Sequence, residues 1–239
     1  MKEEEIRKHY QKEYVVNKYE KKRILSYGGK IVDSNEKEII LSLLKGPETK
    51  RVLDLGAGTG RISLLMAKEG YDVTSFDQSD VMLKTIEEKS KEENLSLTLI
   101  KGDAFNLPFQ DNTFDACVSL RVLWHLPHPE KVISEVQRVL KKDGIFVFDL
   151  LNKKSLRYPY TPLANLFVYT KLMNITEMKG LIASQNLGIE AQRQHFIFPY
   201  LLYRHSPKFI AEPLNKLENK LQTTKMKKYS SVIYFKAKK

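Results

Sequence analysis

The feature that most constrains the fold of this chain is a short apolar segment that leads directly into a glycine-rich turn. Residues 51–60 read RVLDLGAGTG, and the stretch that follows, RISLLMAKE, places apolar side chains at helical spacing. Glycine allows the left-handed backbone of a tight turn and lets a ligand approach the main chain closely. A strand, this turn and a helix in immediate succession are therefore typical of a ligand-binding α/β fold.

Strands and helices continue to alternate after this turn. Further strands are predicted at residues 71–77, 95–103, 113–120 and 144–151. Ser79 can cap one of the intervening helices, and Pro129 starts another apolar-periodic stretch. We therefore assign residues 47–151 to a doubly wound α/β core with a mostly parallel sheet. In such a sheet the ligand site lies at the carboxyl ends of the strands.

Residues 1–46 are predicted to form a helical cap segment ahead of this core. One or two helices are expected over residues 2–27, and they should end at a Gly-Gly pair. A second helical stretch, EKEIILSLL, is expected to follow, with Asp33 or Ser34 as its N-cap.

Residues 152–239 are predicted to supply substrate-cap insertions together with the last helix and strands of the sheet. A helix is expected over residues 176–188, ending at Gly188. Two strands are expected over residues 189–203 and 230–238. A basic helical segment should join these two strands.

The positive charge of the chain is concentrated in its C-terminal third. The whole chain has a formal net charge of +11. Residues 51–150 contain 12 Lys and Arg against 16 Asp and Glu, whereas residues 151–239 contain 16 against 4. This asymmetry suggests either an anionic partner near the C-terminal third or a solvated, lysine-rich face, with equal weight.

The composition favours a globular cytoplasmic protein. Hydrophobic residues make up 42% of the chain, yet no apolar run approaches the roughly 20 residues of a membrane span. The N-terminus lacks the apolar region of a secretory leader. Cys117 is the only cysteine, which excludes an internal disulfide, and its apolar surroundings predict a buried structural thiol.

Three carboxylates lie at the ends of three successive predicted strands. Asp54 precedes the glycine turn, where a cationic ammonium or sulfonium would be attracted and a pyrophosphate repelled. Asp77 ends the second strand, where a carboxylate can accept the hydroxyl groups of a ribose. Asp103 ends the third strand and could accept a hydrogen bond from an exocyclic adenine amine. Together they predict a site for a nucleoside that carries positive charge and no phosphate.

A nicotinamide-binding fold is the main alternative at the glycine turn. A dinucleotide fingerprint would place glycines at positions 56, 58 and 61, but position 61 is Arg61. Asp54 would also repel a pyrophosphate at this turn. Both observations argue against an oxidoreductase.

The segments VLDLGAGTG, FDQS, GDAFNLPF and FDACVSLRVLWHLPHPEKVISEVQRVLKKDGIFVF resemble the successive motifs of class I S-adenosylmethionine-dependent methyltransferases. The resemblance covers about residues 50–150. It is most marked to the broad small-molecule and quinone-biosynthesis type. It implies a seven-stranded Rossmann-like sheet whose last strand is antiparallel, and S-adenosylmethionine as the cofactor.

The same resemblance implies a set of cofactor-binding residues. They are Tyr19, Asp54, Gly56, Ala57, Gly58, Gly60, Asp77, Gln78, Met82, Asp103, Ala104 and Leu120. The glycines would line the methionine part, Asp77 would bind the ribose, and Gln78 and Met82 would flank the adenine. Leu120 would close the site after the fourth strand, and Tyr19 would cover the cofactor.

The loop after the fourth predicted strand holds two catalytic candidates. His125 could act as a general base because its unperturbed pKa lies near neutral pH, although a scaffold role is the stronger alternative. Arg121 could hold an anionic substrate group or pair with a nearby carboxylate. The loop lacks the Asn or Asp, Pro-Pro and aromatic pattern of enzymes that methylate exocyclic base amines. No metal site is predicted.

The sequence therefore predicts methyl transfer from S-adenosylmethionine to a small or lipid-like acceptor, one that bears negative charge. An RNA, such as tRNA, is the alternative acceptor, since RNA would also suit the basic C-terminal third. A nicotinamide-dependent oxidoreductase and a catalytically silent cofactor-binding module are less favoured. The sequence leaves open the oligomeric state and the atom that is methylated.

Overall fold

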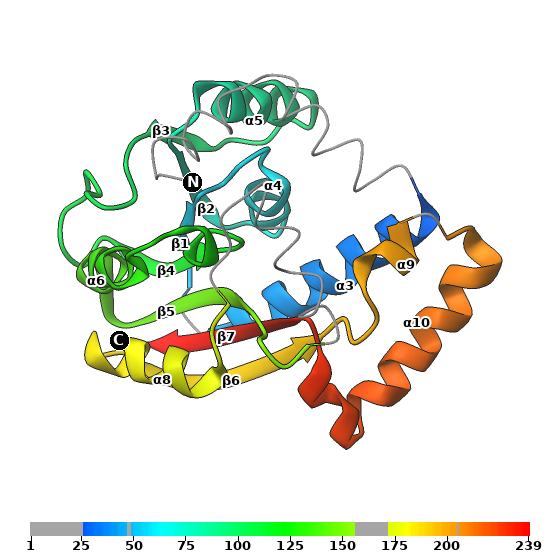
Figure 1. Cartoon of the computed structure of the whole chain (residues 1–239). Helices are drawn as coiled ribbons and strands as arrows, with labels where there is room; N and C mark the ends of the chain where they lie inside the picture. The colour runs from blue at the N-terminus through cyan, green and yellow to red at the C-terminus, as the bar shows by residue number, and fades with distance from the viewer. Residues whose placement is uncertain (1–25, 47–48, 156–171, 205) are drawn as a thin grey trace.

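In the computed structural model of the chain, seven strands form one sheet with helices on both faces (Figure 1). The structure describes residues 26–46, 49–155, 172–204 and 206–239. Tyr19 and nearly all of the helical region expected over residues 2–27 lie outside the described residues. The predicted fold class, a mostly parallel seven-stranded sheet with an antiparallel last strand, is confirmed.

The order of the strands creates a crevice at one edge of the sheet. The strands are β1 (Arg51–Leu55), β2 (Asp72–Asp77), β3 (Thr98–Lys101), β4 (Phe114–Ser119), β5 (Leu140–Leu151), β6 (Gly188–His195) and β7 (Val232–Lys238). Their order is β3-β2-β1-β4-β5-β7-β6, and β7 is antiparallel to both of its neighbours. β1 pairs in parallel with both β2 and β4. The chain thus changes direction across the sheet at β1, and the carboxyl ends of β1 and β4 flank a ligand crevice.

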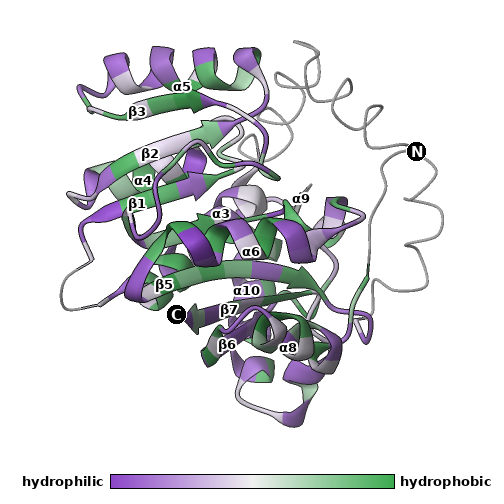
Figure 2. Cartoon of the chain, turned by 90° about the vertical axis from the view of Figure 1, so that its left-hand side faces the viewer, coloured by the Kyte–Doolittle hydropathy of each residue, from purple (hydrophilic) through white to green (hydrophobic). Residues whose placement is uncertain are grey.

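Helices cover both faces of this sheet. The described helices are α3 (Tyr27–Leu44), α4 (Arg61–Lys68), α5 (Asp80–Glu92), α6 (Pro129–Val139), α8 (Ile175–Ser184), α9 (Tyr200–Arg204) and α10 (Lys208–Gln222), with the short 3₁₀ helices η1 (Leu123–His125) and η3 (Lys225–Tyr229). Of these, α9 and α10 pack on α3. α6 and α8 bury Val136 and Ile182 against one face. α3 and α4 bury Ile40 and Met66 against the other. Figure 2 accordingly shows apolar colour along the strands and polar colour on the outer side of α5.

The helix expected to begin after Asp33 or Ser34 begins earlier. α3 starts at Tyr27, and the side chain of Ser26 caps it by accepting a hydrogen bond from the backbone N–H of Gly29 at 3.0 Å. The glycine pair predicted to end a helix therefore lies inside its first turn. A Cβ atom at Gly28 would lie 2.2 Å from the carbonyl oxygen of Tyr203. Glycine at this position serves the close packing of α3 against α9 rather than a chain break.

Two boundaries in the C-terminal third also differ from the prediction. α8 ends at Ser184 rather than at Gly188, and Asn186 takes the left-handed turn with φ of 56°. Asn tolerates this backbone because its short amide side chain can hydrogen-bond locally. Gly188 instead begins β6.

The strand predicted over residues 189–203 ends at His195, where the next residue, Phe196, has a positive φ of 66°. Residues 200–204 form α9 instead. The basic helical segment between the last two strands is present as α10.

Cys117 is buried within β4, as predicted. Among the described residues, no helix is both long and apolar enough to cross a membrane.

Candidate cofactor-binding site

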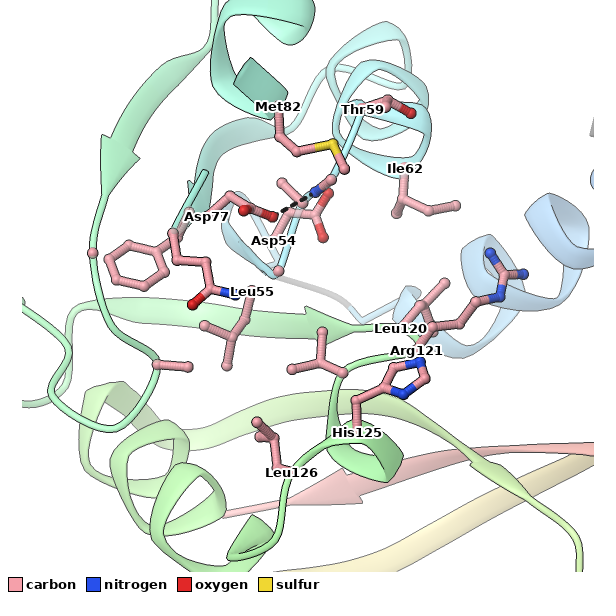
Figure 3. Close-up of a pocket in the computed structure, with 18 of the residues that line it drawn as sticks. Asp54, Leu55, Thr59, Ile62, Asp77, Met82, Leu120, Arg121, His125 and Leu126 are labelled. Carbon is pink, nitrogen blue, oxygen red and sulfur yellow. Dashed lines mark hydrogen bonds between the residues drawn. The ribbon is translucent and has the colours of Figure 1, made fainter. Parts of the chain in front are cut away.

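A pocket of about 240 Å³ lies at the carboxyl ends of β1, β2 and β4 (Figure 3). Most of the residues predicted from the sequence line it: Asp54, Gly56, Ala57, Gly58, Asp77, Gln78, Met82, Asp103, Ala104, Leu120, Arg121 and His125. Figure 3 shows Asp77 and Met82 on one side, with Arg121, His125 and Leu126 opposite. The sheet topology therefore brings together segments that are distant in the sequence.

The glycine turn forms the floor of the pocket and has a left-handed backbone. Gly56 and Gly58 have φ angles of 75° and 55°. The backbone N–H groups of Gly56 and Ala57 both donate to the carbonyl oxygen of Phe76, at 2.8 and 3.1 Å. A Cβ atom at Gly58 would meet no atom within 4 Å, whereas one at Gly56 would lie 2.3 Å from Val122. The turn is thus fixed by β2 and leaves space above Gly58.

Gly60 differs from the other glycines of the turn because it does not line the pocket. It is the N-cap of α4, with φ of 80°. A Cβ atom here would lie 2.8 Å from Ile86 of α5. Gly60 therefore has a packing role between α4 and α5, and its contact with the methionine part stays a prediction.

Asp77 is held by backbone donors from both sides. One carboxylate oxygen accepts from the N–H of Gly58 at 2.9 Å, and the other accepts from the N–H of Ser79 at 2.9 Å. Burial raises the pKa of Asp77, and these backbone hydrogen bonds oppose that rise. A carboxylate has about four acceptor positions, so capacity for a ribose hydroxyl remains.

Asp54 is a buried carboxylate at the start of the turn. It is 4% exposed and accepts a hydrogen bond of 2.5 Å from the hydroxyl of Ser63. Burial raises its pKa to about 6, against the opposing effects of the Ser63 hydroxyl and the Arg61 charge. At neutral pH it is mostly ionised, so it supplies negative charge where a ligand ammonium group would lie.

Asp103 lies just beyond β3, which ends two residues earlier than predicted, at Lys101. One of its carboxylate oxygens accepts from the backbone N–H of Phe105 at 3.0 Å. Phe105 and Ala104 also line this end of the pocket. The combination of an acceptor with apolar walls suits a flat aromatic base with an exocyclic amine.

The two catalytic candidates have different environments. His125 ends η1, is half-buried and lines the pocket beside Leu126. Arg121 has a positive φ of 60°, and its backbone N–H donates to Asp149 at 2.8 Å. Its guanidinium contacts both carboxylate oxygens of Glu36. Of the two roles considered for Arg121, pairing with a carboxylate is the one present in the structure.

Glu36 is the centre of a buried polar network that borders the pocket. It is fully buried on α3 and also forms an ion pair of 2.5 Å with Arg61. The hydroxyl of Tyr234 on β7 donates to it at 2.7 Å. Arg61 additionally pairs with Asp33 at 2.9 Å. The network therefore ties α3, α4, the β4 loop and β7 together at one wall of the pocket.

Asp149 lies beneath this network at the end of β5. One carboxylate oxygen accepts from the N–H of Arg121, and the other has no hydrogen-bond partner among the described residues. Burial raises the pKa of Asp149 to about 7, although the positive charge of Arg121 opposes the rise.

Several lining residues were not predicted from the sequence. They are Leu55, Thr59, Arg61, Ile62, Phe76, Gly102, Phe105, Val122 and Leu126. Glu36 was also missed, although it carried a signal: it lies four residues from both Val32 and Ile40, which are buried on the same helix face. A charged residue at an apolar-face position indicates a buried ion pair.

The pocket fits the chemical groups of S-adenosylmethionine. The buried carboxylate of Asp54 matches the ammonium group of the amino acid moiety, and Asp77 keeps acceptor capacity for a ribose. Met82, Phe105 and Leu120 provide apolar surface for an adenine.

Comparisons with known proteins agree with this site. Residues 53–148 match the family described as "Methyltransferase domain". The demethylmenaquinone methyltransferase of Thermotoga maritima is 32% identical over 139 residues, which are 57% of this chain and 58% of that protein. The ubiquinone biosynthesis O-methyltransferase of Coxiella burnetii is 29% identical over 129 residues, 54% of each chain. The chain thus matches these curated relatives over about half of their length.

The fold also matches a solved structure over nearly its whole length. An S-adenosylmethionine-dependent methyltransferase of Thermotoga maritima, described as a possible histamine N-methyltransferase, has a TM-score of 0.69 and 18% identity. The match covers 95% of this chain and 96% of that chain.

The segment that matches the methyltransferase-domain family, residues 53–148, contains all the residues that line the pocket. The fold around it is similar to that of a solved S-adenosylmethionine-dependent methyltransferase.

Proposed function

We propose that this protein transfers the methyl group of S-adenosylmethionine to a small, lipid-like acceptor that bears negative charge. The observation that carries the proposal is the row of Asp54, Asp77 and Asp103 around one pocket at the switch point of the sheet. The two named relatives, with demethylmenaquinone and ubiquinone biosynthesis in their names, suggest the precursor of an isoprenoid quinone as the acceptor class.

The residues of the pocket would act mainly by positioning. S-adenosylmethionine, when bound, supplies an activated methyl group on a good leaving thioether. Asp54 and the glycine turn would hold the amino acid end, and Asp77 would hold the ribose. The acceptor would approach from the side of His125 and Leu126. In-line orientation and exclusion of water are the contributions that such a site makes to methyl transfer.

His125 is the proposed general base where the acceptor atom starts protonated, as in a phenol. It lies on the wall opposite Asp77 and Met82, which are proposed to hold the nucleoside (Figure 3). Arg121 is proposed as a positioning residue, because its guanidinium already binds Glu36. Its backbone, held by Asp149, would set the path of the loop that carries His125.

The two alternatives, RNA as the acceptor and a nicotinamide as the cofactor, have less support. The named relatives act in quinone biosynthesis, and the comparisons provide no support for RNA as the acceptor. The buried carboxylate beside the glycine turn disfavours a pyrophosphate and hence a nicotinamide cofactor. We propose a cytoplasmic location, since the lone cysteine is buried and reduced.

The first experiment is a calorimetric titration with S-adenosylhomocysteine, with NADH and NADPH as matched controls. We expect micromolar binding of S-adenosylhomocysteine and none of either nicotinamide. Binding of a nicotinamide instead would overturn the assignment. Methyl transfer from labelled S-adenosylmethionine to a panel of hydroxylated and prenylated quinone precursors, with tRNA as the comparison, then tests the acceptor class.

A further inference from the structure

Exposed apolar side chains gather on the surface around α10. Among the described residues, the large hydrophobic side chains with substantial exposure are Tyr27, Leu202, Phe209, Ile210, Leu217 and Met226. Three of them lie on α10, and Met226 lies on η3, which follows it. Phe209 is 76% exposed, an unusual exposure for so large an apolar side chain.

α10 has two faces that differ in their contacts. Its inner face packs on α3, where Asn215 accepts a hydrogen bond of 2.8 Å from Asn35, and Ala211 is fully buried. Its outer face bears Phe209, Pro213, Lys216, Leu217 and Lys220, which lie on one side of the helix and are all exposed. The α10 surface, as we name this outer face with Ile210 and η3, thus combines apolar side chains with lysines.

Among the described residues, neither acidic side chain of α10 forms an ion pair with Lys216 or Lys220, whereas Glu212 pairs with Lys208 at 3.8 Å. Glu218 is fully buried and accepts from the backbone N–H groups of Ile197 and Phe198, at 2.8 and 3.1 Å. Glu212 accepts from the hydroxyl of Tyr27 at 2.7 Å. The α10 surface also includes exposed lysines from η3: Lys225, Lys227 and Lys228. The surface is therefore both apolar and strongly cationic.

The α10 surface lies close to the pocket but does not belong to it. Asn35 on α3 contacts α10, while the next residue, Glu36, contacts Arg121 at the pocket wall. Figure 1 shows α10 at the margin of the molecule, next to α3 and α9. A partner bound to α10 would therefore lie on the far side of α3 from the cofactor.

We propose that the α10 surface docks this protein onto an anionic phospholipid bilayer. Apolar side chains enter the boundary between headgroups and acyl chains, while lysines of the same helix bind the negative headgroups. A nucleic acid would account for the lysines but leaves exposed Phe209 and Leu217 without a role. A second copy of the chain would bring two cationic surfaces together, which is electrostatically unfavourable. The bilayer is the partner that suits both properties.

Vesicle flotation tests this proposal with the full chain. We expect the protein to float with vesicles of phosphatidylcholine and phosphatidylglycerol, and not with phosphatidylcholine alone. K216E/K220E should weaken partitioning by at least about tenfold, because each lysine near an anionic surface contributes to binding. F209S/L217S should also weaken partitioning onto the vesicles, because it removes two apolar side chains without changing the net charge of the protein. The control K142E/K179E makes the same charge change at exposed positions on β5 and α8, away from α10, and should retain binding.

Several results would overturn the proposal. One is that the protein does not float with anionic vesicles. Another is that K142E/K179E loses as much vesicle binding as K216E/K220E. The third is that F209S/L217S binds vesicles as well as the parent does. A dimer that F209S/L217S dissociates, or RNA binding that K216E/K220E abolishes, without flotation, would assign the surface to another partner. Titration of each variant with S-adenosylhomocysteine reports on the pocket separately. A failure of membrane docking is thereby distinguished from a failure of the proposed methyl transfer.

Discussion

The guanidinium of Arg121 contacts both carboxylate oxygens of Glu36, a fully buried residue 85 positions away in the sequence. Glu36 is also bound by Arg61 and by the hydroxyl of Tyr234. This single carboxylate therefore holds the loop after β4 and the start of α4 against α3. The pocket wall that carries His125 depends on it for its position.

We expect Glu36→Ala to lower the free energy of unfolding by about 3 to 5 kcal/mol, because it leaves two guanidinium groups without their shared buried partner. Chemical denaturation monitored by circular dichroism measures this loss. Glu38→Ala, an exposed change on the same helix, is the matched control and should stay within about 0.5 kcal/mol of the parent. Equal effects of the two substitutions would refute the role of Glu36.

Asp77→Ala should remove most of the affinity for S-adenosylhomocysteine while the protein remains folded. The substitution deletes the proposed ribose acceptor and frees the N–H groups of Gly58 and Ser79. Loss of one charged hydrogen-bond partner corresponds to roughly tenfold to hundredfold weaker binding. Calorimetry measures the affinity, and an unchanged dissociation constant would exclude Asp77 as the ribose ligand.

The affinity for S-adenosylhomocysteine should fall as the pH decreases through about 6, the raised pKa of Asp54. Above that pH the carboxylate is ionised and attracts the ligand ammonium, whereas below it the carboxyl is neutral and this attraction is lost. Titrations across this range, compared with Asp54→Asn, measure the effect. The variant should bind weakly at every pH, with a flatter profile. The same steep profile in Asp54→Asn would assign the titration to another group.

Three glycine substitutions separate packing from ligand binding. Gly28→Ala should destabilise the fold by about 1 to 3 kcal/mol, since its Cβ meets the carbonyl oxygen of Tyr203, and leave ligand affinity unchanged. Gly56→Ala should lower both the stability of the fold and the affinity for the ligand, because the φ of Gly56 is positive and an added Cβ would meet Val122. Gly180→Ala, on the exposed side of α8, should be neutral or stabilising. Thermal unfolding and calorimetry together distinguish these outcomes.

His125→Ala should leave the affinity for S-adenosylhomocysteine within about twofold and lower kcat by about a hundredfold, the lower end of the usual contribution of a general base. The measurement is methyl transfer to a phenolic acceptor, with parent and variant compared at the same pH. Equal kcat in parent and variant would leave His125 with a scaffold role alone.

Local sequence determined much of the core. The alternation of apolar strands with helices, the glycine turn and the cap at Ser79 act within a few residues of the chain, so their physical consequences can be read along it. The acidic ends of β1 and β2 and the residue Asp103 follow from the same pattern, because parallel strands bring their carboxyl ends to one edge.

Tertiary structure decided what depends on contacts between distant segments. Gly28 was predicted to end a helix, but the approach of Tyr203 explains why a glycine lies inside α3. The spacing of the glycines in the sequence assigns Gly60 to the ligand-binding turn, yet in the structure a Cβ atom at this position would meet Ile86. The sequence left open whether Arg121 pairs with a carboxylate, and only the fold shows that Glu36 is its partner. Spacing along a chain encodes local periodicity, whereas these partners are set by the three-dimensional path of segments that the sequence does not place side by side.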